Sequence, residues 1–363
     1  MSPPRLLFRA DASAAIGMGH AMRCLALAEA YRGSAGGRSV FLMASPLPAF
    51  ASRAQAGGAA GPGADGAGAE VRALVAPPGS AGDVRETLAT AADVGAGWIV
   101  LDGYEFDGGF QAAVVDVGHR VLALDDYGHG GRYHAQLVLN QNAGADPAPY
   151  ADRAPATRLL LGPRFALLRE EFRNRPARRR SAPARARRVV VTLGGSDPDN
   201  VSARVLEGLA AVPGPLEIVL LVGPANPHRA VLEREAAACL HRVQVVTDVR
   251  DMAKRLAWAD LAVAAAGSTV LELACVGTPQ VLIVLADNQA PGAAAMARDG
   301  LAVSLGRQES VAPDTIAAAV AALAEDAARR NDFSRRSREL VDGQGTTRVL
   351  AAMELTADAE VAA

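Results

Sequence analysis

The chain has 363 residues, of which 50% are hydrophobic and only 4% aromatic, and its formal net charge is −2. At roughly 150 residues per domain this length predicts two domains, and the balanced charge argues against a nucleic-acid partner. No apolar run reaches the ~18 residues of a membrane span, and the amino-terminal residues lack the apolar segment of a secretory signal. Three distant cysteines cannot build a disulfide framework or a zinc site. We therefore expect a soluble, cytoplasmic protein without membrane insertion, and we take a monomer as its oligomeric state.

Short apolar runs rich in β-branched residues alternate with Ala- and Leu-rich helical stretches along the whole chain. The strands expected in the first half are Leu6–Arg9, Val40–Met43, Ala73–Val75, Trp98–Leu101, Val121–Leu124 and Leu137–Leu139. Those expected in the second half are Val189–Leu193, Glu217–Leu221, Val243–Val246, Leu261–Ala264 and Val281–Leu285. Apolar runs without alternation are typical of parallel strands that helices cover on both faces. The pattern predicts the α/β class, with two doubly wound, Rossmann-like domains facing a cleft.

Two stretches of unusual composition interrupt this pattern. Residues 173–188 are half arginine and have no apolar periodicity, which favours a solvated linker between domains over a basic patch for phosphates. Residues 55–70 are almost entirely Gly and Ala, so they bury too little side chain to offset their backbone entropy, and we expect a mobile surface insertion. The expected domains are then residues 1–172 and 189–350, followed by a tail over 351–363.

A small-residue loop containing Gly17 and Gly19 joins the first strand to a helix expected from about His20 to Arg32. The glycines permit close approach of a ligand. Met22 stands where a dinucleotide fingerprint needs its third glycine, so a nicotinamide cofactor is not expected. His20 could simply begin the helix as a capping residue. An imidazole beside such a loop also suits a general base, and we expect the helix dipole to lower its pKa.

Acidic and aromatic residues follow two other strands of the first half. Asp102 and Tyr104 stand at the end of one strand, and Asp125 and Asp126 at the end of another. Because parallel strands in such a sheet present their carboxyl ends at one edge, we expect Asp102 and Tyr104 to lie near His20, and the paired acids could do acid–base or metal chemistry. The alternative is that Asp102 caps a helix, Tyr104 packs in a core and the paired acids form a turn.

Three polar turns in the second half also follow expected strands. They are Gly194–Gly195–Ser196, Gly267–Ser268–Thr269 and Asp287–Asn288–Gln289. The first two precede helices, whose first amides bind anions, so they predict a diphosphate site that needs no metal. Glu272 would accept hydrogen bonds from ribose hydroxyls, although its spacing from Thr269 also fits a capping box. With a base in the first domain, this arrangement is typical of a nucleotide-sugar site without a further cofactor.

Several segments together carry a family resemblance. They are RADASAAIGMGHAMRCLALA, LDGY, LDD, LNQN, LLGPRFALLREEF, VTLGGSDPDN, AAAGSTVLELACVGTP and LADNQ. Through them, residues 5–350 resemble the UDP-sugar hydrolases of pseudaminic acid biosynthesis and related spore-coat polysaccharide biosynthesis proteins. The resemblance implies the two-domain glycosyltransferase B (GT-B) fold. It also implies release of UDP from UDP-2,4-diacetamido-2,4,6-trideoxy-β-L-altropyranose, and we expect water to attack the anomeric carbon with inversion.

The resemblance also implies roles for single residues. His20 would position or activate water, while Tyr104 and Asn288 would complete the active site. Glu272 would bind ribose, and the Gly267–Thr269 loop would bind the diphosphate.

The chain departs from the family pattern at two positions near the expected sugar. Gly103 stands where a histidine is expected, and Tyr127 where an aliphatic residue is usual. Two alternatives to a hydrolase stay open. One is a GT-B glycosyltransferase with a hydroxyl acceptor, and the other is a non-catalytic subunit that binds nucleotide sugars.

Overall fold

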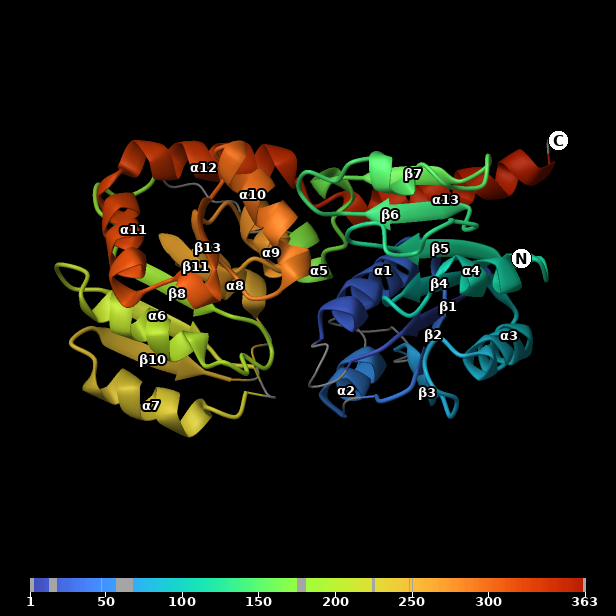
Figure 1. The fold of residues 1–363 in the computed structure, drawn as a ribbon, viewed down its shortest axis with the longest axis horizontal. Coiled ribbons are helices and arrows are strands. Elements are labelled where there is room, and N and C mark those ends of the chain that lie inside the picture. Colours follow the sequence, from blue (N-terminus) through green and yellow to red (C-terminus); the bar gives the residue numbers. More distant parts are fainter. Residues whose placement is uncertain are drawn as a thin grey trace. The chain divides into compact units, whose positions relative to one another are not determined.

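The computed structural model describes residues 3–12, 18–46, 48–56, 68–174, 181–223, 226–247, 249 and 251–361 (Figure 1). Gly17, residues 57–67 of the expected insertion and residues 175–180 of the expected linker lie outside the described residues. The chain forms two compact units. Unit 1 comprises residues 1–170 and 344–363, and unit 2 comprises residues 171–343.

Unit 1 is built on a parallel sheet of seven strands in the order β3-β2-β1-β4-β5-β6-β7. The strands are β1 (Arg5–Ala10), β2 (Ser39–Met43), β3 (Glu70–Ala73), β4 (Ala96–Asp102), β5 (Arg120–Leu124), β6 (Leu137–Asn140) and β7 (Arg158–Leu161). The direction of winding reverses between β1 and β4. Ligands of doubly wound sheets bind at such a switch point, beyond the carboxyl ends of the strands.

Helices cover both faces of this sheet. They are α1 (Gly19–Ala35), α2 (Pro48–Ala56), α3 (Ala81–Val94), α4 (Gly108–Val115) and α13 (Gly345–Val361), with short turns η1 (Ala148–Tyr150) and η2 (Pro163–Phe165). Because side chains alternate along a strand, Leu6 and Phe8 of β1 pack with α1, α2 and α13, while Leu7 packs with α3 and α4. The core of unit 1 therefore has two layers, one on each face of the sheet.

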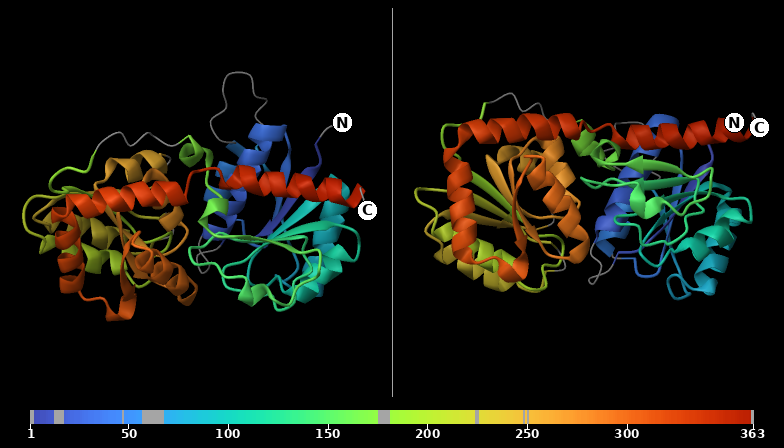
Figure 2. Two further views of the ribbon diagram at one scale, coloured as in Figure 1. Left: turned by 90° about the horizontal axis from the view of Figure 1, so that it is seen from above. Right: turned by 45° about the horizontal axis from the view of Figure 1, so that its top comes forward.

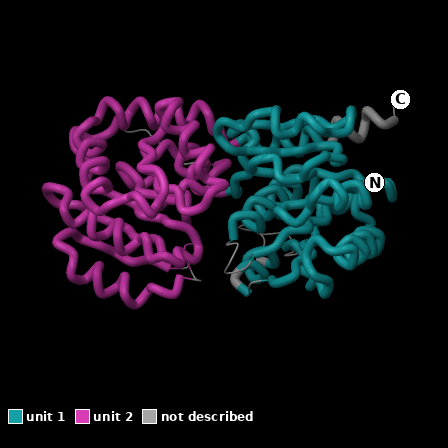
Figure 3. Tube along the Cα trace, in the orientation of Figure 1, with its two compact units in different colours: residues 1–170, 344–363 teal, residues 171–343 magenta. Residues whose placement is uncertain are grey.

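The expected tail after residue 350 is instead part of helix α13, which packs against α1 (Figure 2). Val349, Leu350 and Met353 share one helical face and are buried in the core of unit 1. The chain thus returns to unit 1 at residue 344, before the expected boundary (Figure 3). The prediction of a tail was wrong because the segment has few apolar residues. They become buried only because α13 packs against α1.

Unit 2 is built on six parallel strands in the order β10-β9-β8-β11-β12-β13. The strands are β8 (Arg188–Thr192), β9 (Glu217–Leu221), β10 (Arg242–Val246), β11 (Leu261–Ala265), β12 (Gln280–Val284) and β13 (Val303–Arg307). The helices are α5 (Glu170–Arg173, at the boundary of the units), α6 (Val201–Ala210), α7 (Arg229–Ala238), α8 (Met252–Trp258), α9 (Thr269–Val276), α10 (Ala290–Arg298), α11 (Pro313–Glu325) and α12 (Ala327–Leu340). The turns η3 (Asp287–Gln289) and η4 (Gln308–Ser310) follow β12 and β13. The switch point of this sheet lies between β8 and β11.

The predicted α/β class with two doubly wound domains is confirmed, and the differences lie at sheet edges. The strand expected at Ala73–Val75 is β3, which ends at Ala73, and the sequence did not predict β7 or β13. All three are edge strands, each paired with only one neighbouring strand, and β3 and β13 are partly exposed. β3 (EVRA) and β13 (VSLGR) have no continuous apolar run, so the signal used for the central strands is absent there, whereas the short run of β7 (RLLL) was not recognised as a strand. Within the described part of the chain, no helix is long and apolar enough to cross a membrane.

Candidate functional site

The switch point of unit 1 brings a histidine and an aspartate into contact. Helix α1 begins at Gly19, so His20 lies in its first turn, and Asp102 is the last residue of β4. The Nδ1 atom of His20 lies 2.5 Å from Oδ1 of Asp102. The Asp102 side chain is fully buried, whereas that of His20 is 14% exposed. The pair therefore has a buried acidic end and a partly exposed imidazole.

Arg23, one turn further along α1, clamps the aspartate. Its Nε donates to Oδ2 of Asp102 over 2.7 Å, and its Nη2 donates to Oδ1 over 2.6 Å. Burial alone would raise the pKa of Asp102, but the Arg23 guanidinium and His20 hold that pKa far below its usual value. Asp102 is therefore a permanent carboxylate at neutral pH.

This charge fixes the tautomer of His20. A carboxylate oxygen can only accept, so the proton between the two groups sits on Nδ1 of His20, which donates to Asp102. Nη2 of Arg23 also lies 3.2 Å from Nδ1, but a protonated Nδ1 cannot accept from it. In the neutral ring Nε2 is then the nitrogen with a lone pair, as a general base requires.

The pKa of His20 departs from the sequence-based expectation. Burial lowers it, but the charge of Asp102 and the hydrogen bond to it outweigh burial, and the pKa is raised above its usual value. The expected lowering by the helix dipole was wrong, because a full charge in contact exceeds the half charge of a helix end.

Asp126, in the loop after β5, is a second acid, whose side chain is 9% exposed and is held by several donors. Its Oδ1 accepts from Nη1 of Arg23 over 2.8 Å and from Nδ2 of Asn142 over 2.9 Å. Its Oδ2 accepts from the Tyr104 hydroxyl over 2.9 Å. Burial raises the pKa of Asp126, but Arg23 outweighs this and lowers it overall. Asp126 therefore orients its neighbours, and the same holds for Asp102, so His20 is the better candidate for the base.

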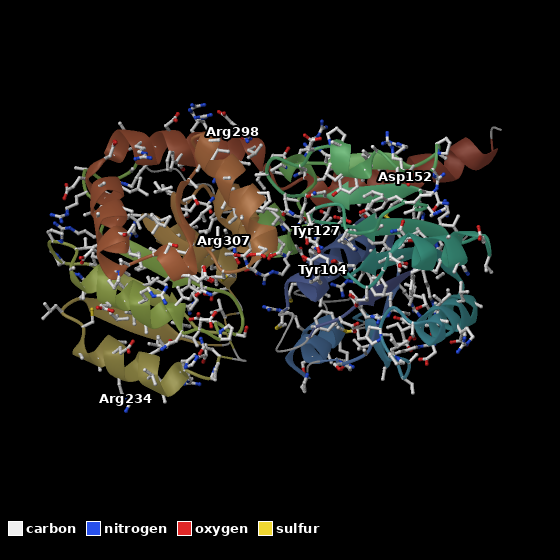
Figure 4. All side chains as sticks on the ribbon, in the orientation of Figure 1. Tyr104, Tyr127, Asp152, Arg234, Arg298 and Arg307 are labelled. Carbon is white, nitrogen blue, oxygen red and sulfur yellow. The ribbon has the colours of Figure 1, made fainter. Side chains whose placement is uncertain are left out.

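Two tyrosines, Tyr104 and Tyr127, which Figure 4 labels, and a second histidine adjoin this cluster. The Tyr104 ring makes edge contacts with His20 and His129, each at 5.2 Å between ring centroids. Tyr127 lies 5.3 Å from Tyr104. His129 Nδ1 lies 2.8 Å from Oδ2 of Asp125, which also accepts from the Tyr133 hydroxyl over 2.5 Å. Sequence-predicted Tyr104, Asp102 and Asp126 thus gather around His20.

Several residues of this cluster were not among the predicted site residues. Arg23 follows His20 at the i+3 spacing that places two side chains on one helical face, and this signal was available. Asn142 follows β6 and reaches Asp126 only through the tertiary fold. Glu105 is half-buried, and burial raises the pKa of its carboxyl, which also interacts electrostatically with His20.

In unit 2, the loop after β8 differs from the expected anion site. Gly194 has a φ of +89°, and the backbone of Gly223 approaches Gly195 so closely that a Cβ on Gly223 would lie 2.1 Å from the Gly195 oxygen. Asp197 accepts from the amides of Val201 and Ser202 over 2.9 and 3.0 Å. The start of α6 is therefore occupied by the chain's own carboxylate. An anion here would meet the loop backbone around Gly195 and Ser196 instead.

The loop after β11 keeps its predicted place beside the switch point. Helix α9 begins at Thr269, and Ser268 is its N-cap residue but makes no side-chain capping bond. Glu272 is therefore the fourth helical residue rather than the third, so the capping-box interpretation does not fit. Glu272 is half-buried in the first turn, and Ser268 beside Gly267 is exposed. The predictions that Glu272 binds ribose and that the Gly267–Thr269 loop binds the diphosphate are compatible with these positions.

The third turn, η3, lies at the carboxyl end of β12, next to β11. The side-chain oxygen of Gln289 accepts from the amide of Leu285 over 2.9 Å. A Cβ placed on Gly267 would lie 3.6 Å from Nε2 of Gln289. Asp287 forms an exposed ion pair with Arg307, while Asn288 is half-buried. The turn and the α9 loop are thus neighbours. Within the described residues, no group of three or more His, Cys, Asp or Glu side chains is arranged to hold a metal ion.

Comparison with known proteins agrees with this architecture. Residues 189–346 match the model of the glycosyltransferase family 28 C-terminal domain. Over 97% of the chain and 99% of its counterpart, the structure superimposes on Acinetobacter baumannii MurG with a TM-score of 0.66 at 17% identity. The fold is of the GT-B type.

Two curated relatives match parts of the chain. The spore coat polysaccharide biosynthesis protein SpsG of Bacillus subtilis (strain 168) is 28% identical over 54% of this chain and 56% of its own length. The UDP-N-acetylglucosamine--N-acetylmuramyl-(pentapeptide) pyrophosphoryl-undecaprenol N-acetylglucosamine transferase of Stutzerimonas stutzeri (strain A1501) is 34% identical over 35% of this chain and 37% of its own length. The matches therefore span about half, or less, of the curated relatives.

Proposed function

We propose that the chain is a GT-B-type enzyme that hydrolyses a UDP-linked amino sugar of the diacetamido-trideoxy class. The single observation that carries the proposal is the pair of His20 and Asp102 at the switch point of unit 1. A fixed tautomer with Nε2 as acceptor suits the activation of a small nucleophile. The match of residues 189–346 to a glycosyltransferase C-terminal domain supports nucleotide binding by unit 2.

In this scheme water attacks the anomeric carbon and gives its proton to Nε2 of His20. The bond from that carbon to the diphosphate oxygen breaks, and its electron pair leaves with UDP. Asn288 contacts the reacting group, and Tyr104 lines the sugar side. A single displacement from the opposite face inverts the anomeric configuration. UDP is a good leaving group, and the amides at the start of α9 with Ser268 and Thr269 stabilise its charge.

Nucleotide recognition in the scheme uses the loops of unit 2. Glu272 accepts from the ribose hydroxyls, and Gly194, Gly195, Ser196 and Gly267 let the backbone approach the diphosphate. Asp287 and Gln289 border the same edge of the sheet. In unit 1, Gly17 and Gly19 precede His20, and their lack of side chains lets the substrate approach.

The test is incubation with several UDP-sugars in the absence of any acceptor, followed by detection of UDP and of the free sugar by NMR. We expect both products, with an inverted anomer formed first. His20→Asn keeps a polar side chain but cannot take the proton, and it should lose about 10²–10⁴-fold in kcat with unchanged UDP affinity. A retained anomer would exclude single displacement, and near-native turnover of His20→Asn would remove His20 as base.

A glycosyltransferase is the second candidate, because the matching domain model and the relative from Stutzerimonas stutzeri are both named as glycosyltransferases. UDP release only after addition of a hydroxyl acceptor would favour it. Binding of UDP-sugars without release under either condition would favour a non-catalytic binding subunit.

A further inference from the structure

Glu105 is an acid of unit 1 that the proposed reaction does not use. It lies in the turn after β4, and its side chain is half-buried. Its carboxyl interacts electrostatically with Arg9 and Asp11 at the end of β1 and with His20 in the first turn of α1. Glu105 therefore lies at the switch point between β1 and β4, where doubly wound sheets bind their ligands.

The Glu105 carboxylate lies directly over Gly103. A Cβ on Gly103 would lie 2.6 and 2.8 Å from the two carboxylate oxygens, which is closer than a real Cβ atom approaches. Gly103 follows Asp102, the partner of His20, and is one of the two positions where the chain departs from the family pattern. The space that a side chain at position 103 would take beside the candidate base is thus filled by the carboxylate of Glu105.

The backbone around Glu105 is fixed on two sides. The amide of Phe106 donates to the carbonyl of Gly103 over 3.4 Å, which closes the turn. A Cβ on Gly79, whose φ is +73°, would lie 2.8 Å from the carbonyl oxygen of Glu105. The Gly79 amide donates to the fully buried carboxylate of Asp83 over 2.9 Å. Because Glu105 is held in place before a ligand arrives, less entropy is lost on binding.

The fold gains no ion pair from the charge of Glu105. The neighbouring acids Asp11, Asp102 and Asp126 each pair with an arginine. Among the described residues, no cation forms an ion pair with Glu105, and the hydrogen bond that its carboxylate accepts comes from its own backbone amide. Burial raises the pKa of this carboxyl, so its charged form is disfavoured in the folded chain. An acid held in such a position indicates a role in function rather than in stability.

We propose that Glu105 is a further substrate-binding residue, which accepts a hydrogen bond from an O–H or N–H group of the sugar that reacts at His20. The inference rests on the proposed function, in which that molecule is a nucleotide sugar. An ionised carboxylate only accepts hydrogen bonds, and hydroxyl and amide groups of a sugar donate them. Such charge-assisted bonds are stronger than bonds between neutral groups.

The charges at this end of the sheet favour the sugar over the diphosphate as the partner of Glu105. Arg9 and Arg23 each pair with two acids already. The Glu105 carboxylate therefore adds to an excess of negative charge, which repels a diphosphate. Loss of Glu105 should for this reason affect the nucleotide sugar and not UDP itself.

The test is steady-state kinetics of the full chain with the UDP-linked diacetamido-trideoxy sugar, together with inhibition of the reaction by UDP. Glu105→Ala should lower kcat/KM by about tenfold or more, because a charge-assisted hydrogen bond is lost, and should leave the inhibition constant of UDP unchanged. Glu105→Gln keeps an acceptor oxygen without the charge, so its kcat/KM should lie between those of wild type and Glu105→Ala. Glu70→Gln removes the charge of an exposed acid in the same unit and is the matched control.

Gly103→Ala is a second variant that moves the carboxylate without removing it. The added methyl group would displace the end of the flexible Glu105 side chain rather than backbone. Gly103→Ala should therefore lower kcat/KM as Glu105→Ala does, and the double variant should lose no more than the larger single loss. Additive losses would overturn the inference, because the two positions would then act independently.

Thermal unfolding separates substrate binding from a structural role. Because the charge of Glu105 is disfavoured in the folded chain, Glu105→Gln should melt at the wild-type temperature or above it. A lower melting temperature of Glu105→Gln, unchanged kcat/KM in Glu105→Ala or an equal loss of UDP inhibition would overturn the inference and leave the proposed function intact. A wild-type chain that releases no UDP from this sugar would overturn the proposed function and the inference with it.

Discussion

Replacing Arg23 with methionine should lower the free energy of unfolding of unit 1 by about 3–5 kcal/mol at pH 8. The guanidinium makes hydrogen bonds of 2.6, 2.7 and 2.8 Å to Asp102 and Asp126. The side chains of Arg23 and the two acids are 8%, 0% and 9% exposed. Methionine fills part of the space but donates nothing, so two buried carboxylates remain without their cation.

The magnitude follows from the number and burial of these bonds. A hydrogen bond to a charged group contributes about 1.5–3 kcal/mol, so three separate bonds would sum to about 4.5–9 kcal/mol. They share one guanidinium and are not additive, and an orphaned acid can take up a proton. The loss should therefore fall in the range of about 3–5 kcal/mol measured when one partner of a buried ion pair is removed.

The loss should depend on pH with a defined sign. In the wild type the pKa values of Asp102 and Asp126 are lowered, so their stabilising contribution is present above the unfolded pKa of about 3.9 and is lost as pH falls further. Without Arg23, burial raises the pKa of these acids, so the variant loses stability as pH rises through the raised values. The difference between wild type and variant should therefore widen from pH 5 to pH 8.

Trp98 offers a local probe, since it is 3% exposed in β4, the strand that ends at Asp102. In a Trp258→Phe background, urea unfolding followed by tryptophan fluorescence reports unit 1. The control is Arg72→Met, which removes an exposed ion-pair partner in the same unit and should cost less than about 1 kcal/mol. A loss below 1 kcal/mol for Arg23→Met, or a difference that does not change with pH, would refute the reasoning.

Three further predictions concern the site. If His20 is the base, kcat should rise with pH through a pKa above about 6.5, because Asp102 raises the pKa of His20. Asp102→Asn should move this rise in kcat to lower pH. A pH–rate profile that does not move would contradict the assignment. Glu272→Ala should weaken UDP binding by about tenfold or more in calorimetry with a chelator present, since a charge-assisted hydrogen bond is lost, and unchanged affinity would exclude the ribose contact. Asp197→Ala leaves two amides of α6 without their acceptor and should destabilise unit 2 by about 1–2 kcal/mol. Urea unfolding followed by Trp258 fluorescence in a Trp98→Phe background measures this loss. A loss near zero would mean that water replaces the Asp197 carboxylate as acceptor.

The gathering of His20, Asp102, Tyr104 and Asp126 could be predicted from the sequence because each follows an apolar strand. In a parallel sheet, that position alone brings residues from distant parts of the chain to one edge. The edge strand β13 could not be found in the same way, because its sequence VSLGR has no continuous apolar run.

The chemistry of the site was harder to predict than its location. The direction of the His20 pKa shift depends on a 2.5 Å contact with Asp102, and no spacing rule gives such a distance. The segment around Asp197 looks like an open anion loop in the sequence, yet its own carboxylate fills the helix start. In both cases the sequence-based expectation fails because the contacts of a charged side chain, Asp102 or Asp197, depend on the tertiary fold.

The return of the chain through α13 makes unit 2 an insertion within unit 1, since residues 171–343 are continuous and unit 1 is not. During synthesis, residues 171–343 are made before the helix that covers one side of α1. Until α13 is made, the surface of unit 1 that Val349 and Met353 cover is exposed to solvent. All residues of the core of unit 2 are already present by then, so unit 2 can fold first. Unit 1 therefore becomes complete in sequence only after the whole of unit 2 has been synthesised.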